Sequence, residues 1–184
     1  DPHRREQSFV DAVDRRQGRW QDAVANFEKA WQLDPRNAAV IWNLSETYAC
    51  LGRYDEARRR FADGLMVNPN AHLFSLARAA IDLKKDGDTT ALGAALENVP
   101  REFDPGGAVT TVVLRLHLMK REYAKAAQVL QRSRYREFND GGIGGTASSL
   151  DGYTFPKEWY EGLVARGQGD AQRAERIFET ALRL

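Results

Sequence analysis

The chain repeats itself with a period of 34 residues through its first half. Four residue types recur at this spacing in a single register: Gly18 and Gly52, Ala23 and Ala57, Phe27 and Phe61, Pro35 and Pro69. A period of this length, with apolar residues at helical spacing, indicates one hairpin of two helices per repeat. One such hairpin cannot bury its own apolar face, so the chain must stack several of them to form a core.

Each repeated position has a role that few residue types can fill. We call the first helix of a hairpin helix A and the second helix B. Gly52 stands where helix A ends, and glycine takes a left-handed conformation there without steric cost. Ala57 lets two helices cross closely, and Phe61 lies on the same face and fills the hairpin core. Pro69, preceded by Asn68, ends helix B.

The same register continues in a degenerate form through the rest of the chain. The third unit has Gly87 at the glycine position, the fourth has Arg121 there, and the fifth has Gly169. The alanine and phenylalanine positions are then occupied by these pairs in units three, four and five: Leu92 and Leu96, Ala126 and Leu130, Ala174 and Phe178. Units three and four have therefore kept the helical pattern but lost most of the repeat residues.

An insertion separates units four and five. Gly169 lies 48 positions after Arg121, which is 14 more than one repeat. The surplus falls at about 138–153, a segment rich in Gly, Ser and Asp that has no apolar period. We expect a loop there, with two alternatives left open: a functional loop or a solvated spacer.

Residues 17–37 and 51–71 closely resemble the second half of a tetratricopeptide repeat (TPR), including its Gly, Ala, Phe and Pro spacing. The resemblance implies an all-α fold, a right-handed α-solenoid of antiparallel helix hairpins. It implies about five TPR-like units in one domain over 1–184, at about 4–37, 38–71, 72–104, 107–137 and 155–184.

The order of the units resembles the degenerate TPR region of multidomain bacterial signalling proteins. Intact early repeats are followed by a decayed third unit, a Gly-rich insert and then PKEWYEGLVARGQGDAQRAERIF. The chain begins with Asp1-Pro2 instead of methionine and stops where another Asp-Pro would follow. We therefore expect a fragment of a longer protein, with an effector domain outside it.

Sequence motifs for catalysis or for a bound cofactor are absent. His3, His72 and His117 are isolated and match no paired ligand spacing, so the sequence predicts neither a metal site nor an enzyme. The run at 141–147 has glycines at dinucleotide-like spacing, but no strand is expected before it. An enzyme with its site in the 138–153 loop is disfavoured, because no constellation of acid, base and nucleophile accompanies the glycines there. We expect no cofactor.

The balance of charge argues against a nucleic-acid partner. The chain has 27 Lys and Arg against 26 Asp and Glu, and acidic residues interleave with the basic ones. No segment approaches the length of apolar residues that a membrane helix needs, so we expect no membrane contact. The compartment is not identified. A single cysteine, Cys50, fits a reducing environment, which slightly favours a soluble, cytoplasmic protein.

The resemblance places the partner surface on the A helices, which line the concave groove of a TPR array. Arginine and aromatic side chains dominate protein interfaces because they bury large areas or present planar donors. By the register of the family, Leu118 and Leu163 lie on the inner face of the later A helices. The groove residues that we predict to bind a partner are Trp42, Asn43, Glu46, Arg78, Arg115, Trp159 and Arg166. For Trp42 and Trp159 the alternative is that the indole packs between helices.

Two functions remain open from the sequence. The first is a non-catalytic protein–protein interaction or scaffold module, which binds a peptide or a partner domain in its groove. It would be the regulatory region of a larger bacterial signalling protein. The alternative is a structural module that self-associates through its terminal repeats and forms a homo-oligomer.

Overall fold

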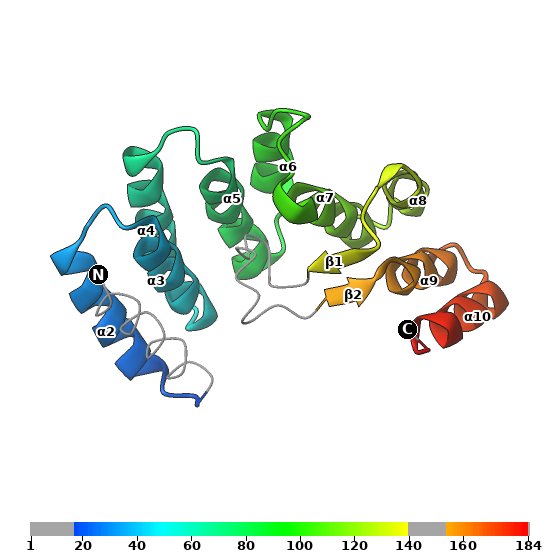
Figure 1. Ribbon diagram of the computed structural model, residues 1–184, viewed down its shortest axis with the longest axis horizontal. Helices are drawn as coiled ribbons and strands as arrows, with labels where there is room; N and C mark the ends of the chain where they lie inside the picture. The colour runs from blue at the N-terminus through cyan, green and yellow to red at the C-terminus, as the bar shows by residue number, and fades with distance from the viewer. Residues whose placement is uncertain (1–16, 140–153, 184) are drawn as a thin grey trace. The chain divides into compact units, whose positions relative to one another are not determined.

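A computed structural model describes residues 17–139 and 154–183 of the chain. It divides into two compact units, Asp1–Ala95 and Leu96–Leu184, and the division falls inside one helix, α6 (Thr90–Glu97) (Figure 1). We describe each unit by itself. The predicted helix A of the first repeat and most of the predicted loop at 138–153 lie outside the described residues.

The first unit consists of consecutive antiparallel helices. They are α2 (Trp20–Leu33), α3 (Ala38–Cys50), α4 (Tyr54–Val67) and α5 (His72–Asp86), followed by the start of α6. Each of the helices from α2 to α5 packs on the next, and Figure 1 shows them side by side. In the predicted repeat register, α3 and α5 are A helices, and α2 and α4 are B helices.

The turns of the hairpins adopt the backbone conformation that the repeat predicts. Gly52 has φ 72°, and Arg121, at the glycine position of unit four, has φ 57°. The left-handed region costs a non-glycine residue about 1–2 kcal/mol, yet Arg121 is held there. The register of the repeat, rather than the residue type, therefore sets this turn.

Helices α2 and α4 end where the proline positions predict. The last helical residues are Leu33 and Val67, and the residues that follow them, Asp34 and Asn68, precede the two prolines. Helix α3 begins immediately afterwards because the side chain of Asn37 caps it. Its Oδ1 accepts hydrogen bonds from the backbone N–H groups of Ala39 at 3.1 Å and Val40 at 3.2 Å.

The core of the first unit is built from the repeated alanines and phenylalanines. All four of these side chains, Ala23, Phe27, Ala57 and Phe61, are buried. A close approach of α5 extends this core: a Cβ atom placed on Gly64 would lie 2.2 Å from Cε1 of Phe74. The absence of a side chain at Gly64 thus lets α5 dock on α4.

The second unit begins at Leu96 and contains two further hairpins. After a 3-10 turn, η1 (Pro105–Gly107), come α7 (Ala108–Met119), α8 (Tyr123–Arg132), α9 (Lys157–Gly167) and α10 (Ala171–Ala181). Helix α7 packs on α8, α8 on α9, and α9 on α10. In the repeat register α7 and α9 are A helices. The predominance of helices in both units confirms the predicted all-α class.

A pair of short strands departs from the prediction. Strand β1 (Glu137–Asn139) pairs antiparallel with β2 (Thr154–Pro156), and Phe138 lies opposite Phe155. Phe138 is buried, with its ring centroid 5.3 Å from that of Tyr160. The expectation that the loop starts at 138 was therefore wrong at its first residues, because the apolar Phe138 belongs to the core of this unit.

Candidate functional site

The predicted binding residues of the first unit differ widely in exposure. Arg78 on α5 is exposed, whereas Asn43 and Glu46 on α3 are half-buried. The amide nitrogen of Asn43 donates a hydrogen bond to the carbonyl oxygen of Ala39 at 2.9 Å, so this side chain braces its own helix. Arg78 is the predicted residue of this unit that is best placed to meet a partner.

Trp42 belongs to the core and not to the surface. Its side chain is 2% exposed, and its ring meets Phe61 at 5.4 Å and Phe74 at 5.0 Å between centroids, both edge to face. The indole Nε1 is buried with no hydrogen-bond partner in the described residues. The packing alternative therefore describes Trp42, and we leave it out of the binding surface.

Trp159 is half-buried and lies between two aromatic rings. Its centroid is 5.6 Å from that of Phe155, in a stacked arrangement, and 5.1 Å from that of Phe178. Arg115, on α7, is also half-buried. Arg166, near the end of α9, is exposed.

A hollow in the second unit brings together several of the residues predicted to face a partner. It has a volume of about 400 Å³ and is lined by Leu118, Tyr123, Leu163, Arg166 and Gly167. Leu118 comes from α7, Tyr123 is the first residue of α8, and the other three come from α9. The family register predicts Leu118, Leu163 and Arg166 on the A-helix face, and the structure places them around one hollow.

The wall of this hollow depends on a contact that the sequence analysis did not predict. A Cβ atom on Gly167 would lie 2.1 Å from Cε1 of Tyr123, so glycine lets the phenol ring pack closely against α9. The turn at Arg121 brings Tyr123 to this position. The only sequence signal for Tyr123 is its alignment with Tyr54 in the repeat.

We name these five residues the α7–α9 hollow. It offers apolar side chains from Leu118 and Leu163, the ring of Tyr123 and the exposed guanidinium of Arg166. Such a surface suits an apolar side chain next to a carboxylate, because a guanidinium binds a carboxylate with two parallel hydrogen bonds.

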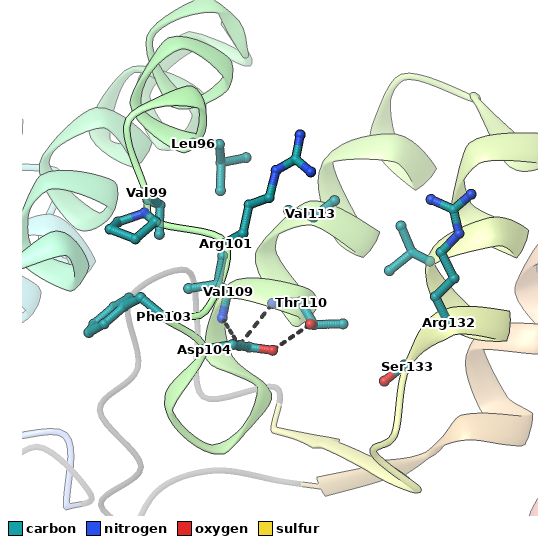
Figure 2. Close-up of a pocket in the computed structure, with 12 residues that line it drawn as sticks. Leu96, Val99, Arg101, Phe103, Asp104, Val109, Thr110, Val113, Arg132 and Ser133 are labelled. Atoms are coloured by element: carbon teal, nitrogen blue, oxygen red, sulfur yellow. Dashed lines mark hydrogen bonds between the residues drawn. The ribbon is translucent and has the colours of Figure 1, made fainter.

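A second hollow of about 300 Å³ lies where α6, the following loop, α7 and α8 meet. Figure 2 shows its apolar residues, among them Leu96, Val109 and Val113, with Arg101 and Arg132 at the rim. The carboxylate of Asp104 is occupied within the fold: Oδ1 accepts from the backbone N–H groups of Val109 at 2.8 Å and Thr110 at 3.2 Å. Asp104 therefore holds the start of α7 and is not available as an acid or base.

Packing also explains the shifted pKa values of two ionisable side chains. Burial, and then a hydrogen bond to Glu28, raise the pKa of Tyr48 to about 12. Hydrogen bonds from Lys125 and His117 lower the pKa of Glu122. The first is a contact between α2 and α3 and the second lies at the turn between α7 and α8, so both shifts are explained by packing of neighbouring helices.

Two features of residues 17–139 and 154–183 bear on other functions. These residues contain no group of three or more His, Cys, Asp or Glu side chains that could hold a metal ion. In the same part of the chain, no helix has both the length and the apolar character needed to cross a bilayer.

Stacked helix hairpins with left-handed turns at a fixed spacing define a helical-repeat protein. The comparison with protein families gives the particular family: residues 15–81 match the model of the tetratricopeptide repeat. This segment belongs to the tetratricopeptide repeat family, which confirms the resemblance of residues 17–37 and 51–71 to that repeat. Proteins of this family generally act as interaction modules for other proteins and are generally non-catalytic.

Solved structures extend the similarity in fold to almost the whole chain. A crystal structure of MamA protein is 17% identical and covers 98% of this chain and 90% of its own, with a TM-score of 0.54. The MamA RS-1 ArsTM double mutant is 16% identical, with a TM-score of 0.57; the match covers 98% of this chain and 93% of the mutant chain. A tetratricopeptide repeat protein from Parabacteroides merdae ATCC 43184 is 15% identical, with a TM-score of 0.55; the match covers 96% of this chain and 77% of that protein's chain. Among curated proteins, none matches the chain.

Proposed function

We propose that this chain is a non-catalytic module that binds a peptide or an extended segment of a partner protein on its A-helix face. The observation that supports this most directly is the α7–α9 hollow, because three of its five residues are those that the repeat register predicts for a partner surface. Arg78 on α5 is the corresponding exposed arginine in the first unit.

The lining of the hollow suggests the chemistry of the ligand. Leu118, Leu163 and Tyr123 would bury one aliphatic or aromatic side chain, and Arg166 would bind a carboxylate beside it. The carboxylate could belong to Asp, Glu or a chain terminus, since all three present the same two oxygens. The ligand we propose is therefore an acidic peptide with at least one large apolar residue.

The wider setting that we propose is the regulatory region of a larger bacterial signalling protein. The support for it is the order of intact repeats, a decayed third unit and a Gly-rich insert. The similarity of fold to a repeat protein from a bacterium is consistent with this setting.

A displayed library of random peptides, selected on the full chain, tests the proposed binding mode. We expect enriched peptides to combine Asp or Glu with a large apolar residue. Binding of a selected peptide should weaken about tenfold in the Arg166→Glu variant, because an attractive charge pair becomes repulsive. Leu163→Ser should weaken it as well, because it removes apolar contact from the hollow.

Arg173→Glu is the matched control, since it makes the same charge change at an exposed position on α10. It should leave peptide affinity within about twofold. If the selected peptides bound both glutamate variants equally, or carried no acidic residue, the hollow would not be the binding site.

A further inference from the structure

The hollow in Figure 2 lies entirely within the second unit, because every residue that lines it follows Ala95 in the chain. Its volume of about 300 Å³ is roughly twice that of an apolar cavity that holds one benzene molecule. An apolar body of about two fused rings would therefore fill it. We call it the arginine-rimmed hollow, with Arg101 and Arg132 at its rim and apolar walls that include Leu96, Val99, Val109, Val113 and Val129.

The polar groups in its wall are already used within the fold. Oδ1 of Asp104 accepts hydrogen bonds from the backbone N–H groups of Val109 and Thr110, and Oδ2 accepts one from the hydroxyl of Thr110 at 2.6 Å. The hydroxyl oxygen of Ser133 accepts a hydrogen bond from the backbone N–H of Tyr135 at 3.2 Å. Burial of a polar group without a partner is costly, so the part of a ligand that enters the hollow must be apolar.

Two arginines make the mouth of the hollow positively charged. Arg101, in the loop after α6, and Arg132, the last residue of α8, are both exposed. Neither guanidinium has an ion pair or a hydrogen bond in residues 17–139 and 154–183. Figure 2 shows both side chains extending to the same side of the hollow, away from Asp104. The mouth therefore offers two planar donors that suit a carboxylate.

The other charged groups nearby do not compensate this mouth. The carboxylate of Asp104 is bound to the first turn of α7, where the positive end of the helix dipole offsets its charge. Arg134 is held elsewhere, since its guanidinium donates a hydrogen bond to the hydroxyl of Tyr135 at 3.1 Å and lies 5.2 Å from the centre of that ring. Arg101 and Arg132 thus remain for an anion from outside the chain.

Contacts within the fold hold the loop that forms one wall. The hydroxyl of Tyr135 donates a hydrogen bond to the carbonyl oxygen of Asp104 at 2.9 Å. The ring of Tyr135 packs against Gly107, where a Cβ atom would lie 3.0 Å from Cδ2. The backbone N–H of Phe103 donates to the carbonyl oxygen of Pro100 at 3.0 Å. A site held in this way loses little conformational entropy on binding, which favours a small, rigid ligand.

We propose that the arginine-rimmed hollow binds a small-molecule carboxylate with a compact apolar body, such as an aromatic acid with two fused rings. The rings fill the apolar interior, and the carboxylate lies at the mouth, where it accepts hydrogen bonds from Arg101 and Arg132. A peptide fits less well, because an extended backbone needs partners for its own N–H and C=O groups. The site shares no residue with the α7–α9 hollow and does not depend on the peptide binding proposed there.

A pair of matched compounds tests the role of charge. The probe is 2-naphthoate, titrated into the full chain and followed by the chemical shifts of the backbone amides, and naphthalene-2-carboxamide is its neutral counterpart. We expect 2-naphthoate to bind about tenfold more tightly, because charge-assisted hydrogen bonds are stronger than neutral ones. The shifts should be largest at the lining residues, among them Val109 and Val113.

Variants of the protein test which residues hold the carboxylate. Arg101→Gln and Arg132→Gln should each weaken the binding of 2-naphthoate about fivefold and change that of the carboxamide less than about twofold. Val113→Phe fills part of the hollow, so it should weaken the binding of both compounds alike. Melting temperatures close to that of the parent chain check that each variant is folded.

Arg166→Gln is the matched control, because it removes an exposed arginine from the α7–α9 hollow, which also combines apolar side chains with a guanidinium. It should leave the affinity for 2-naphthoate unchanged. Three results would overturn the proposal: no binding of 2-naphthoate at millimolar concentration, equal binding of the two compounds, or a larger loss in Arg166→Gln than in the two variants at the rim. The last result would place the ligand in the α7–α9 hollow instead.

Discussion

The indole of Trp42 meets the ring of Phe61 edge to face, with centroids 5.4 Å apart and planes at 73°. Trp159 and Phe178, separated by the same number of positions in the last hairpin, meet at 5.1 Å with planes at 51°. Both pairs join an A helix to its B helix. The tryptophan at this repeat position is therefore part of the hairpin core, and its exposure depends on whether a further helix covers the pair, as α5 covers Trp42 through Phe74.

Replacing Gly64 by alanine should destabilise the first unit. The new Cβ atom would lie 2.2 Å from Cε1 of Phe74, and Phe74 is held by the rings of Trp42 and Phe61. We expect a loss of about 1–3 kcal/mol in the free energy of unfolding, the usual cost of overpacking. Urea denaturation followed by circular dichroism measures it.

The double variant Gly64→Ala, Phe74→Leu tests whether this contact is the cause. A smaller side chain at position 74 makes room for the methyl group, so the double variant should lose less stability than the two single variants added together. Strict additivity would show that Gly64 acts through backbone freedom instead of through close packing.

Replacing Arg121 by glycine should stabilise the second unit. Arg121 has φ 57°, and no other described residue except glycine has a positive φ. Relief of this strain, partly offset by the greater freedom of glycine in the unfolded chain, should raise the free energy of unfolding by about 0.5–1 kcal/mol. Thermal denaturation of the variant and the parent chain provides the comparison.

The neighbouring residue gives a control for this prediction. Lys120 has φ −77°, a conformation open to any residue, so Lys120→Gly should destabilise the unit. If both glycine variants moved the melting temperature in the same direction, the left-handed turn would not be under strain.

The repeat predicts the turns and the inner helix residues because those positions have local requirements. A left-handed residue must end each A helix, and a small residue followed by a large one must line each hairpin. The repeat spacing alone therefore predicts the left-handed turn positions at Gly169 and at Arg121, which is not a glycine. The register also predicts Leu118, Leu163 and Arg166 on the face that the hollow occupies.

What the sequence could not predict depends on contacts between elements. Helix α3 is buried on most sides, so periodicity does not say whether Trp42 faces the core or a partner. Strands β1 and β2 have three residues each, too few to show an alternating pattern. The hollow in Figure 2 is lined by residues from α6 to the end of α8, and no motif unites them.

Replacing Asp104 by alanine should loosen the start of α7. Its carboxylate accepts hydrogen bonds from two backbone N–H groups of the first turn and, at 2.6 Å, from the hydroxyl of Thr110. Loss of such a cap costs about 1 kcal/mol, and it should appear as faster amide hydrogen exchange at Val109 and Thr110. Asp104→Asn keeps one acceptor oxygen, so its amide hydrogen exchange rate should lie between those of the parent chain and Asp104→Ala. Exchange in Asp104→Ala as slow as in the parent chain would argue against the cap.

The stability of the first unit should fall at high pH because of Tyr48. Burial and the hydrogen bond to Glu28 raise its pKa from 10.0 to about 12, so the phenol stays protonated in the folded chain when it ionises in the unfolded one. The stabilisation is complete below about pH 10 and is lost as the pH rises from 10 to 12. Urea midpoints measured across this range should therefore fall more steeply for the parent chain than for Tyr48→Phe.

Glu28→Gln separates the contributions of burial and charge to this pH dependence. The amide keeps an acceptor oxygen for the phenol but removes the negative charge that helps to hold the proton on Tyr48. The fall in stability should then be shallower than in the parent chain and steeper than in Tyr48→Phe, because burial of the phenol remains. Parallel pH profiles for all three proteins would mean that Tyr48 ionises alike in the folded and unfolded chains, against the contact between α2 and α3 described here.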